Sequence, residues 1–264
     1  MLISRTPDDS RRRPFRRGAL VPAAGVLLVL SGCSAFGSRP TTVAPAVKLY
    51  EDGERLFLQE KYPQAREQFQ WLVERHPESD LAPLGRFLIG ETYFRNKDYE
   101  KAAPEFETFV TLFPSNQVAD LGQYRLARSY FDQMPTVERD QKITAQALAE
   151  FQKLIRLYPE SRYAPDAIVK IEAARLRLAQ KELWIAAFYM RQGKYEAALP
   201  RFDAVITTYG RTQAAPEALY QKADALIRLG RSDEAASLLK RLVDEFPASE
   251  WTRRARERQA ARGA

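Results

Sequence analysis

Small, apolar and proline residues recur along the chain at fixed offsets. In five places an alanine is followed 4 residues later by a large apolar residue and 12 residues later by a proline or glycine. The five sets are Ala65-Phe69-Pro77, Ala102-Phe106-Pro114, Ala147-Phe151-Pro159, Ala198-Phe202-Gly210 and Ala235-Leu239-Pro247. Successive alanines are 37, 45, 51 and 37 residues apart. Internal periods of this length predict a repeat architecture.

A second small position precedes each alanine and completes the repeat. It is occupied by Gly53, Gly90, Ala127, Ala186 and Ala223, at 12 residues from the alanine in four repeats and 20 in the third. Small residues at both positions allow two antiparallel helices, A and B, to approach closely where they cross. The large residue one turn after the alanine lies on the same face of helix B, and the proline ends that helix. The pattern therefore predicts five helix pairs.

Two repeats depart from the 37-residue frame. The third has 8 extra residues in the stretch FDQMPTVERDQKITAQA, which predicts a long polar loop between its helices A and B. Ordered loops on a repeat scaffold are usual contact sites. The fourth has 14 extra residues inside helix A. Because 14 residues make about four turns, the lengthened helix keeps its buried face, and we expect it to run from about Ala164 to Arg191.

The predicted fold is all-α, a superhelical solenoid of five helix pairs that bury their apolar faces by stacking. In the second repeat Gly90, Tyr93, Ala102, Phe106 and Pro114 match the tetratricopeptide spacing. The expected repeats cover about residues 47–79, 80–116, 117–161, 162–212 and 213–249, within a domain at 47–255. We expect the basic tail at 256–264, the end of WTRRARERQAARGA, to extend the last helix and fray.

The N-terminal residues have a different character. Six arginines precede Gly18–Leu30, a run of 13 uncharged residues that is too short to span a bilayer. A basic segment followed by a short apolar run is typical of a secretory signal, although the twin arginines at 12 and 13 leave the export route open. The stretch Leu30-Ser31-Gly32-Cys33 resembles the bacterial lipobox. We therefore expect residues 1–32 to be removed as a lipoprotein signal peptide, Cys33 to be acylated, and residues 33–46 to form a flexible tether.

Charge and composition exclude several classes of function and of binding site. The chain has 41 Lys and Arg against 34 Asp and Glu, but the expected signal peptide holds 6 and 2 of these, so the remainder is nearly neutral. This balance does not point to nucleic acid. Cys33 is the only cysteine and His76 the only histidine, which excludes disulfides, histidine-based triads and ordinary zinc sites. Glycine-rich phosphate loops are absent. We expect a scaffold without cofactor or metal, and not an enzyme.

Several features together resemble the BamD family, which supplies a lipoprotein of the outer-membrane β-barrel assembly machine. They are the lipobox, the five repeats, the loop Glu138-Arg139-Asp140-Gln141, and the segments YPESRYAPDA and ELWIAAFYMRQGKYEAALPRF. The resemblance covers about Leu30 to Ala255, and Gly210 departs from it by replacing the usual proline. It implies a lipid anchor at the periplasmic face of the outer membrane. The implied partners are a BamA-like barrel protein, other assembly-machine lipoproteins and unfolded outer-membrane protein precursors.

The resemblance also implies where the BamA-like partner is bound. By this resemblance the contact would lie in repeats four and five. Our own expectation is that the long helix A forms its central surface. Trp184 and Arg191 in that helix, with Arg139 and Asp140 in the long loop, are the candidate partner-surface residues.

An aromatic ladder follows helix A of the first three repeats. Its members, two per helix and seven residues apart on one face, are Tyr50 and Phe57, Phe87 and Phe94, and Tyr124 and Phe131. One interpretation is an apolar slot for an extended peptide, with Arg95 and Arg128 placed to meet a carboxylate. The other is that the ladder only packs the helices together. The sequence leaves both open.

Two other functions fit a periplasmic repeat protein. One is an adaptor of the cell-division or Tol-associated type, whose repeats share the YPxSxxAPDA look but which usually lacks a lipobox. The other is a lipoprotein that docks and regulates a peptidoglycan hydrolase.

Overall fold

The computed structural model of the chain describes residues 44–263, and all the regular elements in this range are α-helices. The expected signal peptide, Cys33 and most of the tether lie outside the described residues. The helices are α1 (Ala46–Leu58), α2 (Tyr62–Arg75), α3 (Ala82–Arg95), α4 (Tyr99–Leu112), α5 (Ala119–Phe131), α6 (Lys142–Leu157), α7 (Ala164–Arg191), α8 (Tyr195–Thr208), α9 (Ala215–Arg228), α10 (Ser232–Glu245) and α11 (Glu250–Gly263). The fold is the tetratricopeptide-like helical solenoid that the periodicity predicts.

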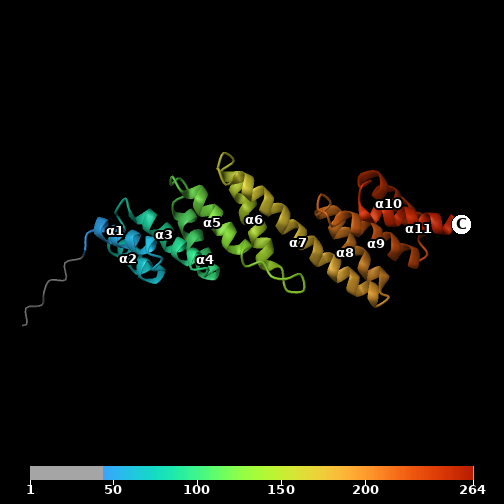
Figure 1. Cartoon of the computed structure of the whole chain (residues 1–264), viewed down its shortest axis with the longest axis horizontal. Helices are drawn as coiled ribbons and strands as arrows, with labels where there is room; N and C mark the ends of the chain where they lie inside the picture. The colour runs from blue at the N-terminus through green and yellow to red at the C-terminus, as the bar shows by residue number, and fades with distance from the viewer. Residues whose placement is uncertain (1–43, 264) are drawn as a thin grey trace, which may run out of the picture. The chain divides into compact units, whose positions relative to one another are not determined.

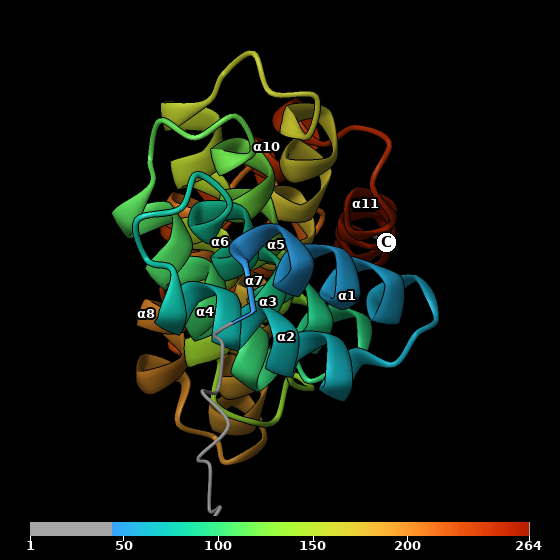
Figure 2. The same cartoon turned by 90° about the vertical axis from the view of Figure 1, so that its left-hand side faces the viewer.

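The helices form consecutive A–B pairs, and each pair packs on the next. Helices α1 and α2 make the first pair and α9 and α10 the fifth, with every B helix also contacting the following A helix. Figure 1 shows the pairs following one another in chain order. In Figure 2, seen from the end of α1 and α2, the later pairs lie behind the first. A helix in this arrangement buries its apolar face only through its neighbours.

Close contact between helices A and B depends on the small residues of the repeat. The Phe69 ring of α2 fills the space beside Gly53 of α1, and a Cβ added at Gly53 would lie 2.5 Å from it. At Gly90 the Phe106 ring takes the same place, at 2.9 Å from an added Cβ. Both rings are fully buried. The small and aromatic positions of the repeat are therefore complementary halves of one contact.

The turns from helix B to the next helix A are alike in all five repeats. The backbone N–H of one residue donates to the carbonyl three residues earlier, as in Ser79 to His76 and Thr212 to Tyr209. The same bond joins Asn116 to Phe113, Ser161 to Tyr158 and Ser249 to Phe246. Proline follows the acceptor in four of these turns and Gly210 in the other. The prolines end helix B because they cannot donate a helical hydrogen bond.

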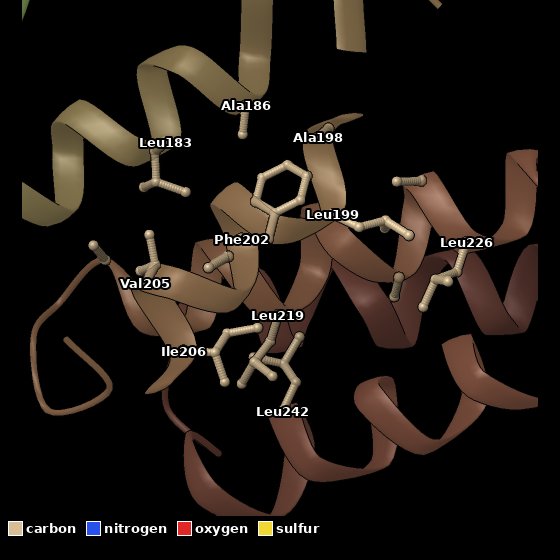
Figure 3. Close-up of a cluster of buried hydrophobic side chains, with 14 of the residues drawn as sticks. Leu183, Ala186, Ala198, Leu199, Phe202, Val205, Ile206, Leu219, Leu226 and Leu242 are labelled. Carbon is tan, nitrogen blue, oxygen red and sulfur yellow. The ribbon is translucent and has the colours of Figure 1, made fainter. Parts of the chain in front are cut away.

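The long helix A of the fourth repeat is observed at the expected residues. Helix α7 has 28 residues, and its two halves pack against different helices. The first half buries Ala167 against the core of α5 and α6, whereas the second buries Leu183 and Ala186 with α8. Figure 3 shows Leu183 and Ala186 facing Phe202 of α8. The insertion thus keeps one face of the helix inward, as about four whole turns require.

The C-terminal segment differs from the prediction. It does not extend α10, because Phe246 and Pro247 end that helix and a separate helix, α11, begins at Glu250. Helix α11 packs against α9 and α10. Thr252 is fully buried, and its hydroxyl donates to the carbonyl oxygens of Phe246 at 2.6 Å and Leu242 at 3.2 Å. The expected tail begins inside this helix, which closes the C-terminal end of the apolar core.

Candidate partner-binding surface

The aromatic ladder lies between the helices of each pair. Phe87 is 5% exposed and Tyr124 is 7% exposed, and the other members are partly buried. Their rings contact aromatic rings of the partner helix B, with centroid distances of 5.6 Å for Phe87–Phe106 and 5.9 Å for Phe131–Phe151. The remaining contacts of this kind are Tyr50–Phe69, Phe57–Tyr62, Phe94–Tyr99 and Tyr124–Phe151. These contacts support the packing interpretation of the ladder.

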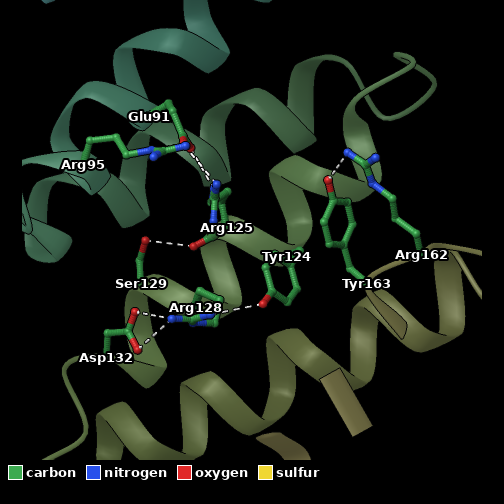
Figure 4. Close-up of polar contacts among 9 residues, drawn as sticks. All are labelled: Glu91, Arg95, Tyr124, Arg125, Arg128, Ser129, Asp132, Arg162 and Tyr163. Carbon is green, nitrogen blue, oxygen red and sulfur yellow. Dashed lines mark hydrogen bonds and ion pairs between the residues drawn. The ribbon is translucent and has the colours of Figure 1, made fainter. Parts of the chain in front are cut away.

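The arginines expected to meet a peptide carboxylate instead meet carboxylates of this chain. Arg95 donates from Nε to Glu91 Oε1 at 2.8 Å. Glu91 is 5% exposed and also accepts two hydrogen bonds from Arg125 of the next repeat, at 2.8 and 3.0 Å. Arg128 pairs with Asp132 at 3.1 Å (Figure 4). Arg95 therefore belongs to an ion-pair network centred on Glu91, and Arg128 to a separate ion pair within α5.

The contacts of Arg128 continue onto the next helix A. The hydroxyl of Tyr124 accepts from Arg128 at 3.1 Å and donates to Asp166 of α7 at 2.5 Å. Burial, and after it the hydrogen bond to Asp166, raise the pKa of Tyr124. Burial alone would raise the pKa of Asp166, but hydrogen bonds from Tyr124 and Lys170 outweigh it and hold that pKa below its ordinary value. The polar contacts join α3, α5 and α7, which are the A helices of successive repeats.

The long loop between α5 and α6 is ordered and rests on α7. Inside the loop, the Gln141 side chain donates to the carbonyl oxygens of Thr136 at 2.7 Å and Arg139 at 3.1 Å. From α7, Arg177 donates to the Pro135 carbonyl at 2.5 Å and Lys181 to the Glu138 carbonyl at 2.9 Å. The loop is thereby fixed against the middle of the long helix.

Arg139 and Asp140 are both exposed on this loop. The Asp140 carboxylate accepts a hydrogen bond from the Lys142 backbone N–H at 2.8 Å and so forms an Asx turn where α6 begins. Asp140 therefore has a structural role, while the Arg139 side chain is presented at the surface.

The exposed face of α7 carries an aromatic and basic stripe. We define the α7 stripe as Lys181, Trp184, Phe188 and Arg191, whose spacing of three and four residues places them on one face of the helix. Trp184 is 40% exposed and Phe188 45% exposed. The Lys181 ammonium lies 4.5 Å from the centre of the Trp184 ring and also holds the loop. Exposed aromatic residues beside basic ones are typical of protein interfaces.

The stripe ends at a cavity formed by α7, α9 and α11. The cavity has a volume of about 400 Å³ and is lined by Ala187, Met190, Arg191, Tyr220, Gln221, Asp224, Trp251, Arg254 and Arg258. Tyr220 and Trp251 contact each other with a centroid distance of 5.4 Å, and the Arg254 guanidinium lies 4.6 Å from the Trp251 ring. Aromatic rings and arginines thus line one recess, which suits an anchoring side chain of a partner.

Two carboxylates on α9, near this cavity, have pKa values that are shifted in opposite directions. Burial would raise the pKa of Asp224, but hydrogen bonds from Arg228 and Arg258 outweigh it, so the pKa lies below its ordinary value. Burial raises the pKa of Glu217, which the Arg254 charge opposes only in part. Asp224 therefore stays ionised and neutralises part of the arginine charge in the cavity.

The cavity is not predicted from the sequence, because the expectation of a fraying C-terminal tail leaves no helix at α11 to form its wall. Trp251, Ala255 and Arg258 follow a helical spacing of four and three residues, and Ala255 is 1% exposed. That spacing was the available signal. The structure brings Arg191 into this cavity and the loop of Arg139 and Asp140 to the other end of the stripe, with Trp184 between them.

Metal and membrane-spanning sites are absent from residues 44–263. No group of three His, Cys, Asp or Glu side chains in the described part of the chain could hold a metal ion. His76 Nε2 lies 2.8 Å from the Ala44 carbonyl oxygen, where a protonated Nε2 would donate to it. None of the helices in this range is long and apolar enough to cross a membrane.

Comparison with known proteins finds similarity to outer membrane lipoproteins and assembly factors. A family profile described as outer membrane lipoprotein, YfiO, matches residues 43–238. The outer membrane protein assembly factor BamD of Caulobacter vibrioides is 32% identical over 244 residues, which are 90% of this chain and 80% of that protein. BamD of Rickettsia prowazekii is 32% identical over 224 residues, covering 85% of this chain and 89% of that protein. Among solved structures, the MamA protein is similar with a TM-score of 0.40 and 16% identity, covering 75% of this chain and 90% of that chain.

Proposed function

Because the chain belongs to the outer membrane lipoprotein family YfiO, whose members include outer membrane protein assembly factors, we propose that it is a lipid-anchored scaffold for the assembly of β-barrel proteins. The observation that carries this proposal is the family match over residues 43–238, which spans nearly all of the helix pairs. A scaffold needs surfaces rather than a catalytic centre, and we propose that the protein is not an enzyme.

The proposed anchor is Cys33, at the periplasmic face of the outer membrane. Several acyl chains on one cysteine would give a durable attachment, whereas a single chain binds only marginally. Replacing Cys33 by alanine should move the protein from the membrane fraction to the soluble periplasmic fraction. Mass spectrometry of the mature N-terminus checks the acylation itself, and an unmodified N-terminal segment would contradict it.

The proposed docking surface for a BamA-like barrel protein is the α7 stripe together with the cavity at its end. Trp184 and Phe188 expose apolar area on a rigid helix, and Lys181 and Arg191 add positive charge at both ends of the stripe. A partner with an apolar contact flanked by acidic side chains would match this surface. Arg139, on the loop that Lys181 holds, extends it toward α5. Other assembly-machine lipoproteins are further proposed partners.

Unfolded outer-membrane protein precursors are the proposed cargo. The partly exposed ladder residues Tyr50, Phe57, Phe94 and Phe131 offer limited apolar surface on the A helices. They could contact an extended peptide only at their edges, because their other faces pack on helix B.

Affinity capture from crosslinked cell envelopes tests the partner. The wild-type lipoprotein should retain a barrel protein with periplasmic domains as its main partner, and Trp184→Ala with Phe188→Ala should reduce that retention severalfold. The matched control is Ile168→Ala with Val169→Ala, two exposed apolar residues on the same helix but away from the stripe. Equal loss in both double variants would show that the stripe is not the contact. Tol components or a murein hydrolase in place of the barrel protein would contradict the proposed function.

A further inference from the structure

A polar corner lies between the middle of α7 and the turn that joins α8 to α9. It encloses a cavity of about 310 Å³ lined by Arg175, Thr207, Thr208, Tyr209, Gly210, Arg211 and Thr212. No lining residue carries a carboxylate, and two carry guanidinium groups from separate elements. The corner is distinct from the stripe and its cavity, with which it shares no lining residue.

Gly210 gives this turn a hydrogen-bond donor that the equivalent turns lack. The other four turns have Pro77, Pro114, Pro159 and Pro247 at this position, and proline has no backbone N–H. An added Cβ at Gly210 would lie 2.5 Å from the Ile206 carbonyl oxygen, so the chain passes too close there for a side chain. The N–H groups of Gly210 and Arg211 make no hydrogen bond with another described residue. The departure from the repeat pattern therefore adds the Gly210 N–H to that of Arg211, so two successive lining residues carry N–H groups that no described residue accepts.

The positive charge of the corner is only partly neutralised. Arg175 has one carboxylate partner within residues 44–263, Glu172, at a long 3.6 Å, and that carboxylate is half exposed. Arg211 is exposed and forms no ion pair with another described residue. By contrast, the arginines of the α3–α5 network are held by carboxylates at 2.8 Å. An anion entering the corner would thus meet positive charge that the described residues compensate only at Arg175 and only in part.

Hydroxyl groups complete the donor set. The hydroxyls of Thr207 and Thr212 already donate to the carbonyls of Asp203 at 2.8 Å and Tyr209 at 2.7 Å. The Thr208 hydroxyl has no such bond within the described part of the chain and is exposed. Within the described residues, the donors without a partner are therefore the Arg211 guanidinium, the hydroxyls of Thr208 and Tyr209, and two backbone N–H groups, and Arg175 adds a guanidinium that is only loosely paired.

We propose that this corner binds a phosphoryl group, either free phosphate or the phosphate of a lipid headgroup. One arginine satisfies both oxygens of a planar carboxylate through a bidentate pair. The corner instead supplies donors from two sides and from the backbone, which suits the three or more oxygens of a phosphoryl group.

The test uses the isotopically labelled, full-length mature lipoprotein in detergent. Its amide signals are followed by NMR during titration with inorganic phosphate, glycerophosphoglycerol or succinate. Phosphate or glycerophosphoglycerol should shift the Gly210 and Arg211 signals in a saturable way. The tighter of these two probes identifies the source as free phosphate or as a headgroup. Succinate should produce only weak, non-saturating shifts at these signals.

Matched variants separate a specific site from general charge attraction. Arg175→Gln and Arg211→Gln should each weaken phosphoryl binding by about tenfold or more, as expected for loss of a charge-assisted contact. Arg253→Gln, an exposed arginine on α11, is the control and should leave binding unchanged. Binding of succinate equal to that of phosphate, no saturable shift with either phosphoryl probe, or an equal effect of the control would each overturn the proposal.

Discussion

Glu91 connects the second and third repeats by ion pairs. Its carboxylate is 5% exposed and accepts hydrogen bonds from Arg95 of its own helix and Arg125 of α5. Removing one member of a buried ion pair leaves the others desolvated and unpaired, which costs more than the pair contributes. The contact between α3 and α5 therefore depends on a single carboxylate, and not only on apolar packing.

Replacing Glu91 by glutamine should lower the free energy of unfolding by about 2–4 kcal/mol, because Arg125 then lacks a charged partner in a mostly buried place. Urea denaturation followed by circular dichroism measures this. Arg95→Gln is the control, since Arg95 is half exposed and its pair should contribute no more than about 1 kcal/mol. A loss for Glu91→Gln as small as that of the control would contradict the account.

Asp224 and Glu217 provide a pH test with opposite signs on one helix. The folded-state pKa of Asp224 is lowered, so its contribution to stability is complete above the ordinary value of about 4 and is lost as the pH falls through the folded value. Asp224→Asn should therefore destabilise the protein at pH 7, and the difference from wild type should shrink below about pH 4.

For Glu217 the folded-state pKa is raised, so stability falls as the pH rises from the ordinary value through the folded one. Glu217→Gln should then stabilise the protein at pH 7 and have little effect near pH 4. Thermal unfolding across this pH range checks both variants. Shifts of the same sign at neutral pH would contradict the assigned environments.

At the scale of the element, the fit of an aromatic ring against a small residue positions helix B on helix A. The sequence predicted that small residues let helices A and B approach closely, but it did not predict that the ring of helix B packs on the glycine of its own pair. It also predicted the bounds of α7, because whole turns preserve an amphipathic face. The pairing of Glu91 with Arg125 could not be predicted, because a frame of 37 residues does not specify which polar residues of neighbouring repeats meet.

Gly53→Ala tests the fit directly. The added methyl group would lie 2.5 Å from the Phe69 ring, so the helices must separate or the ring must move, at a cost of about 1–3 kcal/mol. Gly53→Ala combined with Phe69→Leu should recover part of the loss, because the smaller side chain makes room. Chemical denaturation measures both. If the double variant loses as much stability as the two single variants together, the ring and the glycine do not interact in this way.

The ladder residues divide into packing and accessible members. Phe87→Ala should cost about 3–5 kcal/mol of stability, because the ring is almost fully buried between Phe106 and Phe109. Phe94→Ala and Phe131→Ala, at partly exposed positions, should cost less. If precursor peptides use this surface, the last two variants should weaken peptide binding in fluorescence anisotropy while retaining helicity. Unchanged peptide binding in both variants would show that the ladder residues only pack the helices together.

At the scale of the whole molecule, the C-terminal helix shows what periodicity does not reveal. Helix α11 follows the fifth pair and lies outside the repeat frame. No alanine-aromatic-proline set of the repeat predicts it. Its burial depends on the exposed face of the last pair, which exists only once the solenoid has been assembled. The cavity between α7, α9 and α11 was missed for the same reason, although Arg191 was a candidate from the sequence and the spacing of Trp251, Ala255 and Arg258 indicated a further helix.

The two ends of the solenoid differ in the surface that they offer. The first three repeats direct their ladder residues inward and pair Arg95, Arg125 and Arg128 with carboxylates of the chain. The fourth and fifth expose the α7 stripe and a cavity with arginine and aromatic lining. This division supports a scaffold that docks its partner through the C-terminal half.

Depletion of the protein in the organism that encodes it tests the central claim most directly. The quantity to measure is the amount of folded β-barrel protein in the outer membrane, separated from unfolded forms by its heat-modifiable gel mobility. The account predicts that folded barrels fall severalfold while inner-membrane and soluble periplasmic proteins hold their levels. The wild-type gene should restore them, and the Trp184→Ala, Phe188→Ala variant should restore them only poorly. Normal levels of folded barrels after depletion, with a defect in cell division or in peptidoglycan turnover, would contradict it.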